Sequence, residues 1–189
     1  MKLARTALPG VLIVEPQAFE DERGWFMETF NELRWEAALR ELGEPLPRRF
    51  VQDNHSCSHA GVLRGLHFQA APRAQGKLVR VVRGSAFDVA VDLRPGSPHR
   101  GRWFGITLSA ADRRQLWIPE GFAHGFLALE DDTHFLYKTT DVYDKASERA
   151  IRWDDAELGI AWPALPGGQP PRVSDKDRAA PDLRSLGTW

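Results

Sequence analysis

KLVRVVRGSAFDVAVDLRP, residues 77–95, is the stretch that decides the fold class of this chain. In its second half, apolar side chains alternate with small or acidic ones, and successive side chains of a strand point to opposite faces. One face carries apolar residues from Phe87 to Leu93, and the other carries the residues from Ala86 to Asp92. The alternation predicts a β-strand. Its small, acidic face fits the lining of a wet cavity or simple exposure to solvent.

Similar runs, separated by turn residues, recur along the whole chain. They cover residues 10–16, 21–30, 48–58, 61–69, 102–110, 114–129 and 133–144. This spacing predicts an antiparallel sandwich or barrel, which makes the fold mainly β. The one clear helix signal is NELRWEAALRELG, in which Asn31 can cap the first turn and Gly43 can end the last.

The last residues, from about 160 to 189, are rich in proline, glycine and charge, and predict an irregular C-terminal arm packed on the barrel. No shift of composition marks a second domain, so residues 1–189 are expected to form one domain. Near the start, the apolar run GVLIV is too short for the core of a signal peptide. No stretch approaches the roughly 20 apolar residues of a membrane span. We therefore expect a soluble, cytoplasmic protein.

Charge and cysteine content narrow the range of functions. The 25 lysines and arginines against 26 acidic residues give a net charge of −1, which argues against nucleic acid as a partner and leaves a small anionic ligand open. The single cysteine, Cys57, cannot form an internal disulfide and fits a reducing compartment. The sequence contains no G-x-S-x-G elbow, P-loop or G-x-G-x-x-G turn, which disfavours the chemistry of those motifs.

Within GVLRGLHFQ, residues 61–69, an arginine and a histidine interrupt a hydrophobic strand. Strict alternation would send Arg64 and His67 to opposite faces. Either one of them is incidental, or a bulge at Gly65 brings both into one pocket. An arginine in such a strand needs an anionic partner, either a structural carboxylate or a ligand phosphate. His67 can act as a base near neutral pH or be a hydrogen-bonded core residue.

Two other candidate catalytic residues, Lys77 and Tyr137, each allow two interpretations. Lys77 is either a solvated residue at the end of a strand or a cation that stabilises an oxyanion. Tyr137 is either an aromatic of the barrel wall or a general acid. A catalytic metal would require histidines such as His55, His67 and His124 to converge, and the sequence has no H-x-H pair.

Five segments occur in an order and spacing that resemble the dTDP-4-dehydrorhamnose 3,5-epimerases of the RmlC-like cupin group. They are FVQDNHSCSHAGVLRGLHFQ, QGKLVRVVRGSAFDVAVDLR, RQLWIPEGFAHGF, FLYKTTDVY and VSDKD. The resemblance spans residues 21–183. It implies a cupin-type double-stranded β-helix (jelly roll) with one short N-terminal helix, no metal or other cofactor, and a homodimer.

The same resemblance implies an isomerase. It would invert C3 and C5 of dTDP-4-dehydro-6-deoxy-D-glucose, giving dTDP-4-dehydro-L-rhamnose for dTDP-L-rhamnose synthesis, by proton abstraction next to the C4 ketone. His67 would be the base, oriented by Asp177. Lys77 would stabilise the enolate oxygen, Tyr137 would deliver a proton from the other face of the ring, and Arg64 would bind the diphosphate.

The resemblance also implies positions that bind substrate. Ligand contacts are expected at Gln52, Asp53, Asn54, His124, Glu148 and Lys176. Tyr143 would stack on the thymine ring, and the preceding Val142 departs from an aromatic pair that is frequent in the family. Arg23 and Glu28 would reach the site of a neighbouring subunit, or form a salt-bridged edge strand.

Three alternatives remain at this stage: a single-carbon epimerase on the same scaffold, a metal-dependent cupin enzyme, and a sugar-nucleotide binding module without catalysis.

Overall fold

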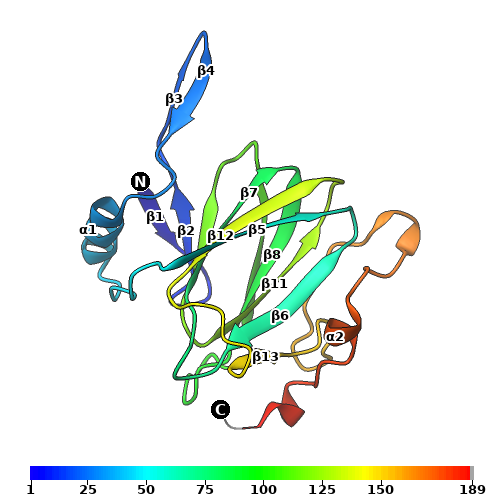
Figure 1. Ribbon diagram of the computed structural model, residues 1–189. Coiled ribbons are helices and arrows are strands. Elements are labelled where there is room, and N and C mark those ends of the chain that lie inside the picture. Colours follow the sequence, from blue (N-terminus) through cyan, green and yellow to red (C-terminus); the bar gives the residue numbers. More distant parts are fainter. Residues whose placement is uncertain (188–189) are drawn as a thin grey trace.

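Two antiparallel sheets face one another in the computed structural model, which describes residues 1–187 (Figure 1). The first sheet contains, in spatial order, β1 (Lys2–Arg5), β2 (Leu12–Glu15), β10 (Gln115–Ile118), β7 (Lys77–Arg83), β12 (Thr133–Thr139) and β5 (Gln52–Ser58). The second contains β13 (Glu148–Ala150), β6 (Leu63–Gln69), β11 (Phe122–Ala128), β8 (Ser85–Asp92) and β9 (Trp103–Ser109). The fold is therefore mainly β and of the cupin type, as expected.

The alternation in β8 follows from its place between two cores. Ala86 and Ala90 face the other sheet and pack in the central core with Phe126 and Phe135. The apolar face of β8 packs instead under residues of the C-terminal arm: Trp162, Leu183 and Leu186. Asp88, on the small and acidic face, is fully buried, so this face lines the barrel interior and is not exposed to solvent.

The predicted helix is α1 (Glu32–Leu42), and both of its predicted ends are confirmed. The Asn31 side chain accepts a hydrogen bond from the backbone N–H of Arg34, and Gly43 ends the helix in the left-handed conformation at φ 73°. The buried Trp35 and Leu39 pack against the first sheet, in a cluster that includes Trp117. No helix among residues 1–187 has the length and apolar character needed to span a bilayer.

Between residues 160 and 187 the C-terminal arm is irregular, as predicted, and its helical turns are short: η1 (Pro166–Gly168), α2 (Asp175–Arg178) and η2 (Arg184–Leu186). It runs beside β6 in Figure 1. The backbone of Arg172 accepts a hydrogen bond from the N–H of Leu63 at 2.9 Å and donates one to the carbonyl of Gly61 at 2.7 Å. These contacts place α2 next to the middle of β6.

A hairpin of β3 (Ala18–Asp21) and β4 (Gly24–Met27) projects away from the barrel (Figure 1). Three of its aromatic side chains are exposed, among them Phe26 at 70%. An apolar surface of this kind on a protruding segment is typical of a site that another protein surface covers.

Candidate active site

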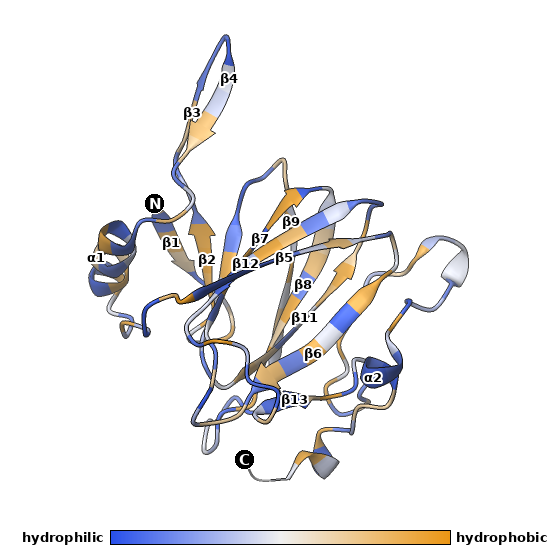
Figure 2. Cartoon of the chain, in the orientation of Figure 1, coloured by the Kyte–Doolittle hydropathy of each residue, from blue (hydrophilic) through white to orange (hydrophobic). Residues whose placement is uncertain are grey.

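The strand β6 contains the predicted bulge. Across the pair of β6 and β11, His67 lies opposite His124 and Arg64 lies opposite Phe126, so three steps on β6 match two on β11. Gly65 has φ 133°, and a Cβ there would lie 2.5 Å from the facing backbone of β11. The extra residue resets the alternation, and Arg64 and His67 line the same cavity. Figure 2 shows hydrophilic positions that interrupt the hydrophobic strand.

That cavity has a volume of about 390 Å³ and lies where the two sheets and the arm meet. Most of the residues singled out from the sequence line it: Gln52, Asn54, Arg64, His67, Lys77, His124, Tyr137, Tyr143, Glu148, Lys176 and Asp177. They come from both sheets, from the loop after β12 and from the arm. The structure therefore gathers into one site residues that are more than one hundred positions apart.

His67 and Asp177 form a tight pair in this cavity. The Nε2 atom of His67 lies 2.5 Å from Oδ1 of Asp177, whose side chain is almost completely buried. Burial by itself raises the pKa of the Asp177 carboxyl, but the hydrogen bond and charge of His67 and the N–H of Gly65 outweigh it and hold that pKa below its ordinary value. The carboxylate thus fixes the orientation of the ring through Nε2, which leaves Nδ1 to take a proton.

Lys77 is buried, not solvated, at the start of β7. Its ammonium donates a hydrogen bond to the backbone carbonyl of His67 at 3.1 Å. Burial lowers the pKa of Lys77 to about 8, although the carboxylates of Asp88 and Glu148 oppose this change. A lysine with this pKa is a cation near neutral pH, and in a buried site it can stabilise negative charge strongly.

Tyr137 reaches the cavity from the sheet opposite His67. It belongs to β12 of the first sheet, whereas His67 belongs to β6 of the second. Burial raises the pKa of the Tyr137 hydroxyl, the positive charge of Arg64 opposes this rise, and the carboxylate of Glu148 adds to it. The hydroxyl is therefore protonated at neutral pH and can donate a proton.

A second histidine and carboxylate pair lies deeper in the barrel. Nε2 of His124 lies 2.9 Å from Oδ2 of Asp88, and both side chains are buried. Burial lowers the pKa of His124 although Asp88 raises it, and the nearby Lys77 ammonium adds to the lowering. Sequence reasoning did not assign Asp88 to the site, yet its signal was present in the small, acidic face of β8.

Cationic groups lie toward both ends of the cavity, with Arg64 beside Ser58 and Lys176 beside Glu148. Arg64 donates from Nε to the hydroxyl of Ser58 at 3.1 Å and from Nη2 to the carbonyl of Cys57 at 3.4 Å. Both partners are neutral, so these bonds leave its charge available for an anion. Glu148 accepts from the Lys176 ammonium at 2.5 Å and from the Tyr143 hydroxyl at 3.0 Å.

Glu148 is an acceptor in its ionised form. Burial raises the pKa of its carboxyl, but the hydrogen bonds from Lys176 and Tyr143 outweigh burial and hold that pKa below its ordinary value.

Asp53, Arg23 and Glu28 do not line the cavity of their own chain. Alternation along β5 turns Asp53 to the outer face of the sheet, where it pairs with Lys138 at 2.8 Å, while its neighbours on either side face inward. Asp53 therefore lies outside the lining of this cavity. Arg23 pairs with Asp21 in the projecting hairpin, and Glu28 forms an ion pair with Arg34 at the start of α1.

The histidines named for a metal site do not converge. His55 lies on the outer face of β5, where its Nε2 lies 2.9 Å from Nδ1 of His134. His67 and His124 are each bonded to a separate aspartate inside the barrel. Within residues 1–187, no three side chains of His, Cys, Asp or Glu are grouped so that they could hold a metal ion.

Some lining residues were missed from the sequence: Ser56, Gln69, Gln75, Phe126, Arg172 and Ser174. Gln69 had a usable signal, because it follows His67 by two positions in a strand and therefore shares its face. Arg172 and Ser174 had none, because they lie in the arm, whose path no periodicity predicts.

A carboxylate-supported histidine on one sheet, a protonated tyrosine on the other and a buried lysine define a cupin-fold enzyme of acid–base chemistry. The family model described as dTDP-4-dehydrorhamnose 3,5-epimerase matches residues 5–185. The chain belongs to this family of isomerases.

Known relatives agree with this assignment. The chain is 55% identical over 177 residues to a dTDP-4-dehydrorhamnose 3,5-epimerase of Shigella flexneri, covering 94% of this chain and 93% of the relative. A crystal structure of dTDP-6-deoxy-D-glucose-3,5-epimerase from Legionella pneumophila, in complex with dTDP-4-keto-L-rhamnose, superimposes with a TM-score of 0.90 at 46% identity, covering 98% and 94% of the two chains.

A 3′-monoepimerase from Streptomyces bikiniensis, in complex with dTDP-quinovose, is more distant. It has a TM-score of 0.83 and 35% identity, covering 95% of this chain and 86% of that one. The same fold therefore serves enzymes that invert one carbon and enzymes that invert two.

Proposed function

We propose that this chain inverts C3 and C5 of dTDP-4-dehydro-6-deoxy-D-glucose, giving dTDP-4-dehydro-L-rhamnose for dTDP-L-rhamnose synthesis. The observation that carries this proposal is the position of His67 and Tyr137 on opposite sheets with one cavity between them. Inversion requires that a proton leave one face of a carbon and return to the other face. A base and an acid on opposite walls meet this requirement without moving the sugar.

The chemistry needs only proton transfers. The C4 ketone acidifies the adjacent C–H groups. His67 takes the proton, the electron pair of the C–H bond moves into the ketone, and an enolate oxygen forms. The Lys77 ammonium stabilises that oxygen. At C5, Tyr137 then gives its proton to the opposite face of the carbon, which restores the ketone with inverted configuration. Exchange with solvent removes the proton from His67 and returns one to Tyr137. These proton transfers balance without an oxidant, a metal or a cofactor.

The remaining lining residues suit a nucleotide diphosphate. Arg64 binds the diphosphate with its free charge, and Tyr143, at the cavity rim, stacks on the thymine. Val142 precedes it, so this chain offers one ring there. His124, Lys176 and Asn54 supply hydrogen bonds to the sugar and phosphates.

The active form is a homodimer in this proposal. The exposed aromatic residues of the β3–β4 hairpin are covered by the partner, and Arg23 and Glu28 complete the partner's cavity. The exposed, unpaired Cys57 suits a reducing compartment, so the cytoplasm is the proposed location. Mixing a His67→Asn protein with an Arg23→Ala protein tests the dimer: mixed dimers regain one complete site, whereas separate sites within single chains would give no recovery.

Turnover in deuterium oxide tests the reaction itself. The double epimerase incorporates deuterium at both C3 and C5, and the wild type retains its activity in EDTA. His67→Asn should lower exchange by at least about 10³-fold while dTDP still binds. His59→Asn, at an exposed histidine, is the matched control and should leave exchange unchanged. Deuterium at a single carbon would contradict the proposal and indicate a single-carbon epimerase. Binding of dTDP without any exchange would indicate a binding module without catalysis.

Tyr137→Phe separates the two proton transfers. Removal of the hydroxyl takes away the donor on the wall opposite His67, so deuterium exchange at C3 should persist while inversion at C5 is lost. Equal loss at both carbons would contradict a donor role of Tyr137 that is confined to C5.

A further inference from the structure

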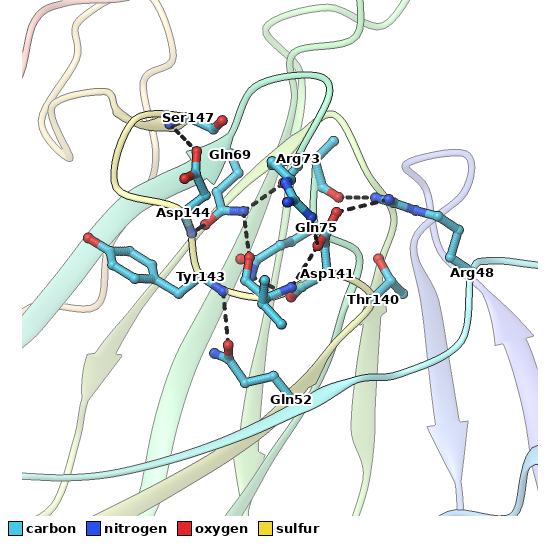
Figure 3. Close-up of polar contacts among 12 residues, drawn as sticks. Arg48, Gln52, Gln69, Arg73, Gln75, Thr140, Asp141, Tyr143, Asp144 and Ser147 are labelled. Atoms are coloured by element: carbon cyan, nitrogen blue, oxygen red, sulfur yellow. Dashed lines mark hydrogen bonds and ion pairs between the residues drawn. The ribbon is translucent and has the colours of Figure 1, made fainter.

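The loop of residues 140–147, between β12 and β13, presents Tyr143 to the cavity without any helix or strand of its own. The Tyr143 side chain is 55% exposed, so packing alone does not fix its ring. Instead, polar side chains from several other segments bind the loop (Figure 3).

Two glutamine side chains hold the backbone on both sides of Tyr143. Gln52 accepts the backbone N–H of Tyr143 at 2.9 Å. Gln69 accepts the N–H of Asp144 at 2.8 Å and donates to the carbonyl of Val142 at 3.2 Å. Both glutamines project from barrel strands, so they tie the loop to the rigid part of the molecule.

Asp141 anchors the start of the same loop. Its Oδ1 accepts the N–H of Val142 at 2.8 Å and Nη1 of Arg73 at 3.1 Å, and its Oδ2 accepts Nη1 of Arg48 at 3.0 Å. Its backbone carbonyl accepts Nε2 of Gln75 at 2.8 Å. Burial raises the pKa of the Asp141 carboxyl, but the N–H of Val142 and the guanidinium groups of Arg48 and Arg73 outweigh burial and hold that pKa below its ordinary value.

The two arginines connect Asp141 to other parts of the chain. Arg48 also donates to Glu120 at 2.8 Å and to the backbone carbonyl of Ala74. Figure 3 shows both guanidinium groups directed at the one carboxylate. Charge-assisted hydrogen bonds to a nearly buried carboxylate are among the stronger polar contacts of a protein, so this cluster orders the loop before any ligand binds.

Asp141 itself does not line the cavity that holds His67 and Tyr137. We propose that Asp141, held by Arg48 and Arg73, is a positioning residue: it fixes the loop so that Tyr143 stands ready for the nucleotide base, and it thereby sets nucleotide affinity without affecting proton transfer. This inference rests on the proposed function, because it requires a nucleotide base at Tyr143. A preordered loop avoids the entropy cost of ordering on binding, which is the reason for the gain in affinity.

Asp141→Asn tests the inference, because the amide keeps the shape but offers one oxygen to three donors. The dissociation constant for dTDP, measured by titration calorimetry, should rise about tenfold, with kcat for deuterium exchange within about twofold of the wild type. Asp154→Asn is the matched control: Asp154 binds Arg152 through both oxygens, does not line the cavity, and its loss should leave dTDP affinity unchanged.

A double-mutant cycle with Tyr143→Ala separates positioning from a general structural role. If Asp141 acts through Tyr143, then Asp141→Asn should change dTDP affinity by less than about twofold in the Tyr143→Ala background. An equal loss in both backgrounds would overturn the inference, as would a fall in kcat as large as the loss of affinity. Should Asp141→Asn not fold, Arg73→Gln, which removes one donor at a half-exposed side chain, takes its place in the same cycle.

Failure of this inference is distinguishable from failure of the proposed function. If the wild type inverts both carbons but the effects of Asp141→Asn and Tyr143→Ala on dTDP affinity are additive, only the role of Asp141 is refuted. If the wild type binds dTDP but shows no deuterium exchange, the proposed reaction is refuted, and the double-mutant cycle on dTDP affinity still tests the role of Asp141.

Discussion

Replacement of Lys77 by methionine should stabilise the fold at neutral pH and remove catalysis at the same time. Methionine has a similar length, is apolar and suits the buried position at the start of β7. The native lysine is costly there, since burial lowers its pKa from 10.5 to about 8. The substitution removes this cost together with the cation that stabilises the enolate in the proposed reaction.

The magnitude follows from the pKa difference between the folded and unfolded chain. At 1.36 kcal/mol for each pH unit, the step from 10.5 to about 8 corresponds to about 3 kcal/mol lost from the stability of the folded state. Methionine also loses the hydrogen bond to the carbonyl of His67, worth about 1 kcal/mol. The variant should therefore be about 2 kcal/mol more stable than the wild type near pH 7.

The pH dependence gives the sharper test. Between pH 8 and 10.5 the unfolded chain binds more protons at Lys77 than the folded chain does, so the free energy of unfolding of the wild type rises with pH across this window. Below pH 8 the full cost of burying the charge is present. The advantage of Lys77→Met should thus be constant below pH 8 and disappear, leaving a small deficit, by about pH 10.5.

Urea unfolding of both proteins at equal concentration from pH 6.5 to 10.5 measures this difference, with Lys145→Met, at an exposed lysine, as the control. In parallel, kcat for exchange should fall about 10² to 10³-fold in Lys77→Met, and kcat/KM of the wild type should fall above about pH 8 as Lys77 loses its proton. A stability difference that stays constant over the whole pH range would refute the reasoning, because Lys77 would then not be desolvated.

Two further predictions concern the bulge at Gly65, tested by urea unfolding, and the contact of Asp177 with His67, tested by kcat. Gly65→Ala should lower the free energy of unfolding by about 3 to 5 kcal/mol, since it adds a backbone clash to the strain of positive φ. Gly24 is the control, because it has a similar φ of 125° with open space around it. Gly24→Ala should lower the free energy of unfolding by about 1 to 2 kcal/mol. Equal costs would show that contact with β11 is unimportant. Asp177→Asn should lower kcat about 10²-fold, because it removes the carboxylate that orients the His67 ring, whereas the exposed Asp175 should tolerate the same change. Unchanged kcat would remove Asp177 from the mechanism.

Several features of the fold could be predicted from the sequence because they depend on neighbouring residues alone. The ends of α1 follow from Asn31 and Gly43, whose backbone and side-chain preferences act within one turn. The bulge at Gly65 follows from two polar residues that must share one face of a strand, and only glycine fits its backbone there. The linked motifs of the family then indicated most of the residues that line the cavity.

The local pattern could not settle which surface each face meets. The acidic face of β8 fitted either solvent or a cavity, and only packing against the first sheet made it interior. The family resemblance implied a ligand contact at Asp53, but alternation along β5 turns its side chain to the outer face of the sheet.

By itself, the sequence determined the fold class, the helix, the bulge and the residue types that acid–base chemistry requires, because periodicity and backbone preference are local. Only the tertiary structure decided which groups act together and in what protonation state. The arm brings Asp177 to His67 across 110 positions, and burial lowers the pKa of Lys77 to about 8. Distance between remote segments and exclusion of water are properties of the packed molecule, and no short stretch of sequence contains them.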